Sequence, residues 1–265
     1  MALFHIGDFP IDPITLYSIT TFTTLLLVSF LALHLLLPRT ASLAPRLLFF
    51  WHTFDSLVHF ILEGSFLAHT FLSSTPILPA PRDPSAAIHP LTPPGVFWLN
   101  DPARLYGVKF GEGWLAGMWR DYARADRRWE GADLTVVSLE VLTVVVGAPL
   151  AAGIAWAIWQ AGGRVQRKTA FWITVLATGE IYGSWMTFAP EWFTGSPNLD
   201  ISNPIFLGDA SRRLDRNDVP TDRRHRWCYL VSMNFVWIVF AVYGMYISYG
   251  VLTEEPTTKA GKKTQ

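Results

Sequence analysis

The sequence contains a single cysteine, Cys228, among its 265 residues. One thiol cannot form a disulfide within the chain, and it cannot build a zinc site that needs several cysteines. Excess charge is also missing, because 21 basic and 21 acidic residues leave a formal net charge of zero. Since nucleic-acid binding needs a basic surface, we expect no nucleic-acid partner.

Two further patterns are missing, and a third is limited to one stretch of the chain. Residues 1–13 contain no Lys or Arg, and the first apolar run is too long for the core of a cleavable signal, so we expect no such signal. No internal repeat is evident, which argues against a transporter built from inverted repeats. Proline-rich sequence is confined to residues 76–94, which we interpret as an irregular loop.

Long apolar runs are abundant. The chain is 51% hydrophobic, its mean hydropathy is +0.27, and it contains 12 Trp and 18 Phe. About 20 apolar residues are enough to cross a bilayer as a helix. Runs of that length occupy residues 14–37, 47–72, 134–159, 170–193 and 227–252. We therefore predict an all-α integral membrane protein with five transmembrane helices in a bundle.

The loops between these runs predict how the chain is oriented. The first and third connections carry basic residues and no acid, whereas the N-terminal arm carries acids only. Under the positive-inside rule the N-terminus lies outside the cytosol and the tail, 253–265, lies inside it. Lys262 and Lys263 of that tail resemble a dilysine retrieval signal, which a receptor reads. We expect a multi-pass protein of the endoplasmic reticulum membrane.

The second run carries the most informative polar groups. His52, Asp55, His59 and Glu63 follow one another at three- and four-residue steps, so they share one helix face. A charged side chain at the bilayer centre costs about 2.5–3.5 kcal/mol on insertion scales, and it usually faces the bundle interior. The stripe could be a proton relay, a ligand site or a metal site. Di-metal bundles normally use Glu-x-x-His pairs, and none occurs here, so we expect no metal.

Other runs contribute polar residues of the same kind: Glu140 and Thr143 in the third, Glu180 in the fourth, and Asn234 and Trp237 in the fifth. Together with the stripe they predict an intramembrane ligand cavity with apolar and aromatic walls. In a dry pocket one carboxyl group can keep its proton and act as an acid, while a second holds negative charge. An indole face can stabilise a cation. The set fits a reaction that adds a proton at one carbon, passes through a carbocation and removes a proton from another carbon.

Structural interpretations of the same residues stay open. The polar groups could satisfy one another through hydrogen bonds, without any chemistry. Gly179 and Gly183 are four residues apart, a spacing that predicts a close contact between helices.

The loop between the second and third runs predicts one more helix. Within residues 113–129, Trp114, Met118 and Tyr122 recur at helical spacing with charges between them. This pattern predicts an amphipathic helix on the membrane interface or over the mouth of the bundle. We expect its charged residues to face solvent: Asp121, Asp126 and Arg127.

Five segments resemble the emopamil-binding protein family, in the family's own order. They are HFILEGSF in the second run, WRDYARADRRW in the loop, DLTVVSLEVLT in the third run, GEIYGS in the fourth and MNFVW in the fifth. The resemblance covers residues 47–252 and implies a four-helix membrane domain of the EXPERA type, with loop insertions at about 76–110 and 207–226. Residues 1–46 then hold an N-terminal arm and a first transmembrane helix, and 253–265 a polar tail.

The resemblance implies a sterol Δ8–Δ7 isomerase, which protonates a ring double bond to a carbocation at C8 and removes the proton at C7. It implies that His59, Glu63 and Glu140 are catalytic. It also implies four substrate-binding residues, Thr143, Tyr182, Asn234 and Trp237, with Trp237 as the wall that stabilises the cation. A proton shift needs no metal and no redox cofactor. The expected partners are the sterol, the lipid bilayer, cationic amphiphilic inhibitors and a second copy in a homodimer.

Departures from the family pattern leave alternatives open. Asp55 adds an acid where an apolar residue is expected, and Ser65 and Ser184 stand where Trp and Asp are expected. Asp55 and Glu180 are therefore additional candidates for the site. The chain could also be an isomerase or a proton-initiated cyclase that acts on another polycyclic terpenoid. It could instead bind sterols or amphiphiles without catalysis.

Overall fold

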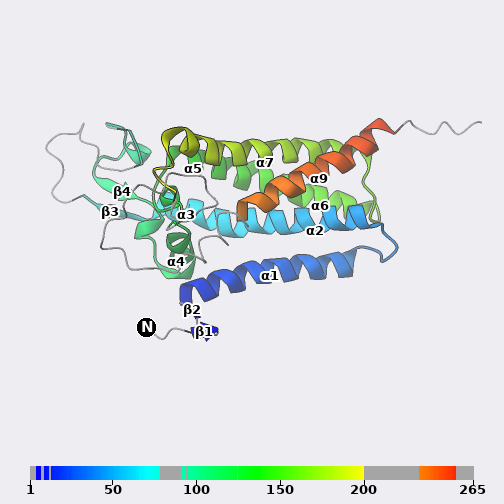
Figure 1. Ribbon diagram of the computed structural model, residues 1–265, viewed down its shortest axis with the longest axis horizontal. Coiled ribbons are helices and arrows are strands. Elements are labelled where there is room, and N and C mark those ends of the chain that lie inside the picture. The colour runs from blue at the N-terminus through cyan, green and yellow to red at the C-terminus, as the bar shows by residue number, and fades with distance from the viewer. Residues whose placement is uncertain are drawn as a thin grey trace, which may run out of the picture.

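The computed structural model describes residues 4–6, 9–11, 13–77, 91–93, 95–123, 125–199 and 233–254. Its long helical stretches are α1 Pro13–Leu36; α2 Leu43–Leu57 continued by η1 Val58–Glu63 and α3 Gly64–Leu72; α5 Leu134–Leu142 continued by η5 Thr143–Gly147 and α6 Ala148–Gln160; α7 Arg167–Thr194; and α9 Met233–Thr253. They lie side by side, with α1 against α2, α2 against α6, and α7 against α9 (Figure 1). Each apolar run is helical over nearly all of its described residues, and residues 227–232 of the last run lie outside them.

Shorter elements connect α3 to α5 and precede α1. The connection contains β3 Ser74–Pro76, η2 Trp98–Asn100, β4 Arg104–Tyr106, η3 Val108–Phe110, α4 Gly113–Tyr122 and η4 Arg127–Trp129. β3 pairs antiparallel with β4, and before α1 the strand β1 Phe4–Ile6 pairs antiparallel with β2 Phe9–Ile11. The predicted insertion at 207–226 lies outside the described residues, as does part of the insertion at 76–110.

By length and composition, three described helical segments can cross a membrane: Leu16–Leu36, Leu134–Gln160 and Phe235–Thr253. The chain is therefore a membrane protein built mostly of helices. α7 has 28 residues and packs along α9, but polar residues interrupt its apolar sequence. The stretch that contains η1 is interrupted in the same way by the predicted polar stripe.

Wide π-helical turns occur in two of the described stretches and contact each other: η1, which contains His59 and Glu63, and η5, which begins at Thr143. η5 ends two residues before Pro149, which lies in the first turn of α6. A proline has no N–H to donate, so the preceding turn must rearrange its hydrogen bonds. π-Helical turns are frequent at functional sites.

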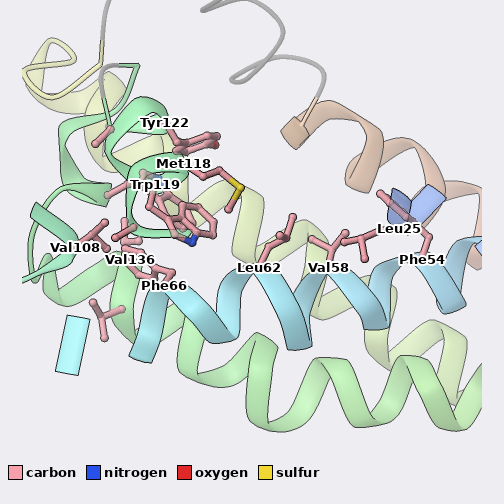
Figure 2. Close-up of a cluster of buried hydrophobic side chains, with 14 of the residues drawn as sticks. Leu25, Phe54, Val58, Leu62, Phe66, Val108, Met118, Trp119, Tyr122 and Val136 are labelled. Carbon is pink, nitrogen blue, oxygen red and sulfur yellow. The ribbon is translucent and has the colours of Figure 1, made fainter. Parts of the chain in front are cut away.

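A buried hydrophobic cluster joins the second helical stretch to α4 and η4 (Figure 2). Trp119 and Trp129 stack with ring centroids 5.0 Å apart, and the Phe66 ring lies 4.8 Å from that of Trp129. Figure 2 shows Val58, Leu62 and Phe66 along the face of the helix that is turned toward α4. Burying one large apolar side chain stabilises a fold by about 1.5–3 kcal/mol, so these residues hold α4 against the bundle. The helix predicted in this loop is confirmed at Gly113–Tyr122, where Met118 and Tyr122 are buried and Trp114 is exposed.

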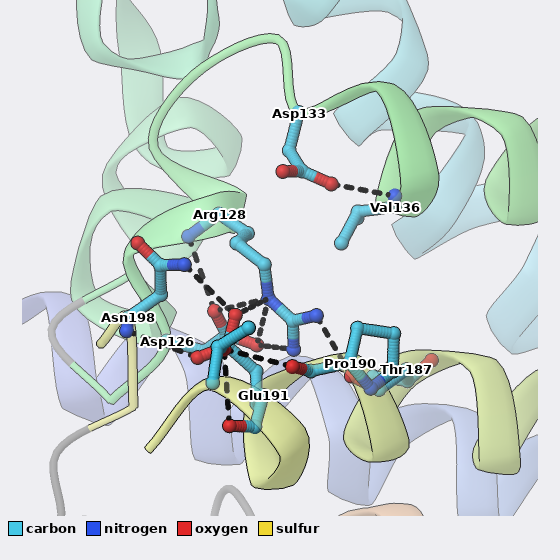
Figure 3. Close-up of polar contacts among 9 residues, drawn as sticks. Asp126, Arg128, Asp133, Val136, Thr187, Pro190, Glu191 and Asn198 are labelled. Carbon is cyan, nitrogen blue, oxygen red and sulfur yellow. Dashed lines mark hydrogen bonds and ion pairs between the residues drawn. The ribbon is translucent and has the colours of Figure 1, made fainter. Parts of the chain in front are cut away.

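A buried ion network ties the loop before α5 to the C-terminal end of α7 (Figure 3). Nη2 of Arg128 donates to Oδ2 of Asp126 at 2.6 Å, and Nη1 donates to the carbonyl of Thr187 at 2.7 Å. Nε of Arg128 also lies 3.6 Å from Oε1 of Glu191. Burial alone would lower the pKa of Arg128, but the two carboxylates raise it above its ordinary value, so the guanidinium keeps its charge.

The solvent-facing position predicted for Asp126 is wrong, because its side chain is only 1% exposed. Its carboxylate accepts the Arg128 backbone N–H and so caps η4, which turns it inward toward the guanidinium. Arg127 is exposed as predicted, and Asp121 is half-buried. Alternating charges in a short loop therefore did not reveal which acid would be buried.

Candidate functional site

A cavity of about 420 Å³ opens between the helical stretches near η1 and η5. Pockets for drug-sized ligands span roughly 300–1,000 Å³. Most of the wall is apolar or aromatic, and it includes Phe22, Val58, Leu62, Met118, Trp119, Tyr122, Trp129, Leu139, Leu142, Val146, Leu150, Val175, Leu176 and Trp237. Among the described residues, the polar lining comes from α1, η1, α5, η5 and α7: Ser18, His59, Glu63, Glu140, Thr143, Glu180, Ser184 and Thr187. The cavity thus suits a large apolar ligand that meets a few ionisable groups.

His59 lies at the centre of the polar lining, with a carboxyl group at each ring nitrogen. Nδ1 is 2.5 Å from Oε2 of Glu63, and Nε2 is 3.0 Å from Oδ1 of Asp55. His59 is 4% exposed and Asp55 is fully buried. Two carboxylate partners require both ring nitrogens to donate, which only the imidazolium form can do. His59 therefore acts as a fixed cation between two acids and has no ring nitrogen left for another ligand.

Glu63 meets a second glutamate across the cavity. Thr143 donates its hydroxyl to Oε2 of Glu63 at 2.8 Å, and it also contacts the Glu140 carbonyl at 3.0 Å. The carboxyl group of Glu140, which is 7% exposed as a residue, hydrogen-bonds with that of Glu63. Two carboxyl groups in contact cannot both ionise freely, so they share a proton. The Glu63–Glu140 pair can therefore give a proton or take one.

Trp237 connects α9 to this network. Its indole Nε1 donates to Oδ1 of Asp55 at 2.7 Å, and its ring centroid lies 6.4 Å from that of His59. Trp51 packs edge-on against it at a centroid distance of 5.3 Å. Because its polar edge is bonded to Asp55 while Trp237 also lines the cavity, the indole presents a fixed aromatic wall to a ligand.

The structure brings most of the predicted site residues together. His59, Glu63, Glu140 and Thr143 meet directly, and Asp55, Glu180 and Trp237 join them through hydrogen bonds.

Other predicted positions are not brought into this cluster. His52 is buried, but its Nδ1 bonds to the carbonyl of Leu48 in its own helix and it does not line the cavity. Tyr182 is 68% exposed and does not line the cavity, so its contact with a ligand remains a prediction. Asn234 lies in the first turn of α9, and its side chain is outside the described part of the chain.

The close helix contact predicted at Gly179 and Gly183 is wrong. A Cβ atom added at either glycine would meet no described atom within 4 Å, and both residues line the cavity. Close packing between α7 and α9 occurs at Gly244 instead, where a Cβ would lie 3.0 Å from Ile173. The two glycines therefore leave room for a ligand. Helical spacing alone could not show this, because small residues suit a close helix and a cavity equally well.

Part of the chain that lines the cavity matches a known protein family. A family model described as EBP, EXPERA (EXPanded EBP superfamily), matches residues 114–248. That segment contains Glu140, Thr143, Glu180 and Trp237, whereas His59 and the other residues of η1 precede it.

Relatives among curated proteins carry one shared name. The chain is 23% identical over 130 residues to the 3-beta-hydroxysteroid-Delta(8),Delta(7)-isomerase of Cavia porcellus, an alignment of 48% of this chain and 46% of the relative. It is 25% identical over 129 residues to that of Mus musculus, with the same coverage. It is 30% identical over 135 residues to a probable 3-beta-hydroxysteroid-Delta(8),Delta(7)-isomerase of Arabidopsis thaliana, covering 51% of this chain and 44% of the relative. The chain thus spans about half the length of the curated relatives it matches.

Proposed function

The chain belongs to the EBP family of the expanded EBP superfamily, and from this premise we propose that it is a sterol Δ8–Δ7 isomerase. The observation that carries the proposal is the Glu63–Glu140 carboxyl pair on an apolar cavity, with His59 bonded to the same Glu63 oxygen that accepts the Thr143 hydroxyl. The relatives are named as isomerases of this kind, which supports the same substrate class.

The reaction adds one proton and removes another. The π electrons of the 8-ene bond take a proton at C9, a C–H bond forms there, and C8 becomes a tertiary carbocation. The C–H bond at C7 then breaks, its electrons form the 7-ene bond, and the proton passes to a carboxylate of the site. No electron is gained or lost, so the carboxyl groups supply the general acid and base that this proton shift needs, with His59 as the fixed cation between them.

The carbocation needs negative charge and an aromatic face close by. Glu63 and Asp55 flank the imidazolium of His59 and leave an excess of negative charge beside the cavity. The Trp237 ring, held by Asp55, faces the same cavity. A cation near an indole gains about 0.5–2 kcal/mol. Cationic amphiphiles would occupy the site because their ammonium group resembles the reaction's positive charge.

We also propose how the chain is arranged in the membrane. The helical stretches that begin at α1, α2, α5, α7 and α9 form five membrane spans, and residues 47–252 make the EXPERA-type domain. The protein resides in the endoplasmic reticulum membrane with its C-terminal tail in the cytosol, and it forms a homodimer. The lysine-bearing end of that tail lies outside the described residues.

The proposal is tested by incubating purified protein, in detergent or vesicles, with a 3β-hydroxy 8-ene sterol and following the sterol by mass spectrometry with chromatographic standards. The expected product is the 7-ene isomer, formed equally well in the presence of a chelator. A sterol that binds but is recovered unchanged would contradict the isomerase proposal and favour a binding protein. Conversion of another polycyclic terpenoid, with no change in the sterol, would replace the proposed substrate.

Replacing Gly183 by leucine is expected to weaken the binding of a cationic sterol-like amphiphile. The new side chain would occupy cavity space that is now open. Overpacking typically costs about 1–3 kcal/mol, which corresponds to roughly 5–150-fold in affinity. Tryptophan fluorescence titration measures the change. Gly153→Leu is the matched control, since Gly153 also faces open space on a helix but does not line the cavity. Equal affinity in Gly183→Leu and Gly153→Leu would contradict the placement of the ligand.

A further inference from the structure

A second pair of carboxyl groups lies on the other side of His59. Asp55 comes from α2 and is fully buried, whereas Glu180 comes from α7 and lines the cavity. The carboxyl group of Glu180 lies within hydrogen-bonding reach of that of Asp55. Asp55 also bonds to Nε2 of His59, just as Glu63 bonds to Nδ1. The imidazole therefore lies between two carboxyl pairs, each with a member that lines the cavity.

Two buried oxygens of this second pair lack a donor, which indicates that the pair holds a proton. Oδ1 of Asp55 accepts from Trp237 and faces His59. Oδ2 of Asp55 and Oε1 of Glu180 are buried and receive no hydrogen bond from a donor group among the described residues. Two carboxylates in contact repel each other, and a proton on one of them turns the contact into a hydrogen bond. The pair is therefore a carboxylic acid bonded to a carboxylate.

We propose that Asp55 and Glu180 form a second acid–base pair of the site, in which Glu180 exchanges a proton with the substrate and Asp55 positions it. The inference rests on the proposed isomerase function and deepens it. An isomerisation needs one group that gives a proton and one that takes a proton. The two pairs allow different residues to perform these steps, with the fixed charge of His59 between them.

One pair gives its shared proton to C9, where a C–H bond forms, and that pair is left with two carboxylates beside His59. The C–H bond at C7 breaks, its electrons form the new double bond, and the proton passes to the other pair, which is left with two carboxylic acids. Water that enters when the product leaves restores one proton to the first pair and removes one from the second.

Isotopic labelling tests the separation of the two steps. A sterol carrying deuterium at both C7 positions is converted over many turnovers in ordinary water. C9 gains its proton before C7 loses one, so a deuteron taken from C7 can only reach C9 of the next sterol. If different pairs act, the product keeps one deuterium at C7 and has only ordinary hydrogen at C9. Deuterium at C9 would mean that one group took the deuteron from one sterol and gave it to the next, and this would overturn the proposal.

Glu180→Gln tests the residue itself. The glutamine amide can still donate to Asp55, so the contact between α7 and α2 is kept, but it cannot exchange a proton. We expect kcat to fall by about 10²–10⁴-fold, the usual contribution of a general acid or base, with KM and amphiphile affinity unchanged. Asp55→Asn, which breaks the pair from the other side, is expected to lower kcat as well. Glu112→Gln, the same change at an exposed glutamate, is the control. Full activity in a folded Glu180→Gln protein would overturn the proposal.

Infrared spectroscopy provides a readout that does not need turnover. A protonated carboxylic acid shows a carbonyl stretch that a carboxylate lacks, and Glu180→Gln is expected to remove one such band from the purified protein. Persistence of every band would contradict the second pair. If the band is lost but no sterol is isomerised by the unmodified protein, the pair exists and the proposed sterol function fails. The two failures are thereby distinguished.

Discussion

Replacing Glu63 by glutamine is expected to lower the isomerisation rate by about 10²–10⁴-fold. Glutamine keeps the shape of the side chain and an oxygen that can accept from Thr143. It cannot share a proton with Glu140, and it removes the carboxylate that faces Nδ1 of His59. The proton-giving and proton-taking function of this pair is then lost while the cavity remains.

Binding measured in the same Glu63→Gln protein separates chemistry from folding. Asp55 and Glu140 remain beside the cavity, so a cationic amphiphile is expected to bind with nearly unchanged affinity. Turnover is followed with the 8-ene sterol and binding by tryptophan fluorescence, with Glu112→Gln as the exposed control. Full turnover in Glu63→Gln would remove Glu63 from the mechanism.

Replacing Arg128 by methionine is expected to destabilise the protein by about 3–5 kcal/mol. Methionine fills similar volume, but it leaves the carboxylates of Asp126 and Glu191 buried without the positive charge that they face. It also leaves the Thr187 carbonyl without its donor. Breaking one side of a buried ion network is costly because the remaining charge stays out of water.

The free energy of unfolding in detergent, measured by denaturant titration, checks this expectation for Arg128→Met. Arg127→Met is the matched control, because Arg127 is the exposed neighbour. The control is expected to lie within about 0.5 kcal/mol of the original protein, as exposed substitutions usually do. Similar losses in both variants would show that the buried network does not hold the loop to α7.

The long helices could be predicted from sequence because a run of apolar residues has few alternatives in a bilayer. α1, α7 and the stretch from α5 to α6 fall within a few residues of the runs that predicted them. The pairing of His59 with Glu63 was also predictable, since residues four apart on one helix are neighbours. The resemblance to the EBP family is confirmed by the match at residues 114–248.

Contacts between segments that are far apart in the sequence could not be predicted from it. Nothing in the second run alone indicates that Asp55 bonds to Trp237, which is 182 residues away, or to Glu180 on α7. The two π-helical turns, which contact each other, were not predicted either. The four-residue spacing of Gly179 and Gly183 wrongly predicted a close contact between helices, because this spacing is equally compatible with a cavity. In each case the outcome depends on which element lies opposite.

The most direct test of the central claim, a proton shift in this cavity, is conversion of the 8-ene sterol in heavy water, followed by locating the deuterium in the product. We predict a 7-ene sterol that carries one deuterium, at C9, because the added proton comes from carboxyl groups that exchange with the solvent. A 7-ene product without deuterium at C9, or a bound sterol that is never converted, would contradict the account.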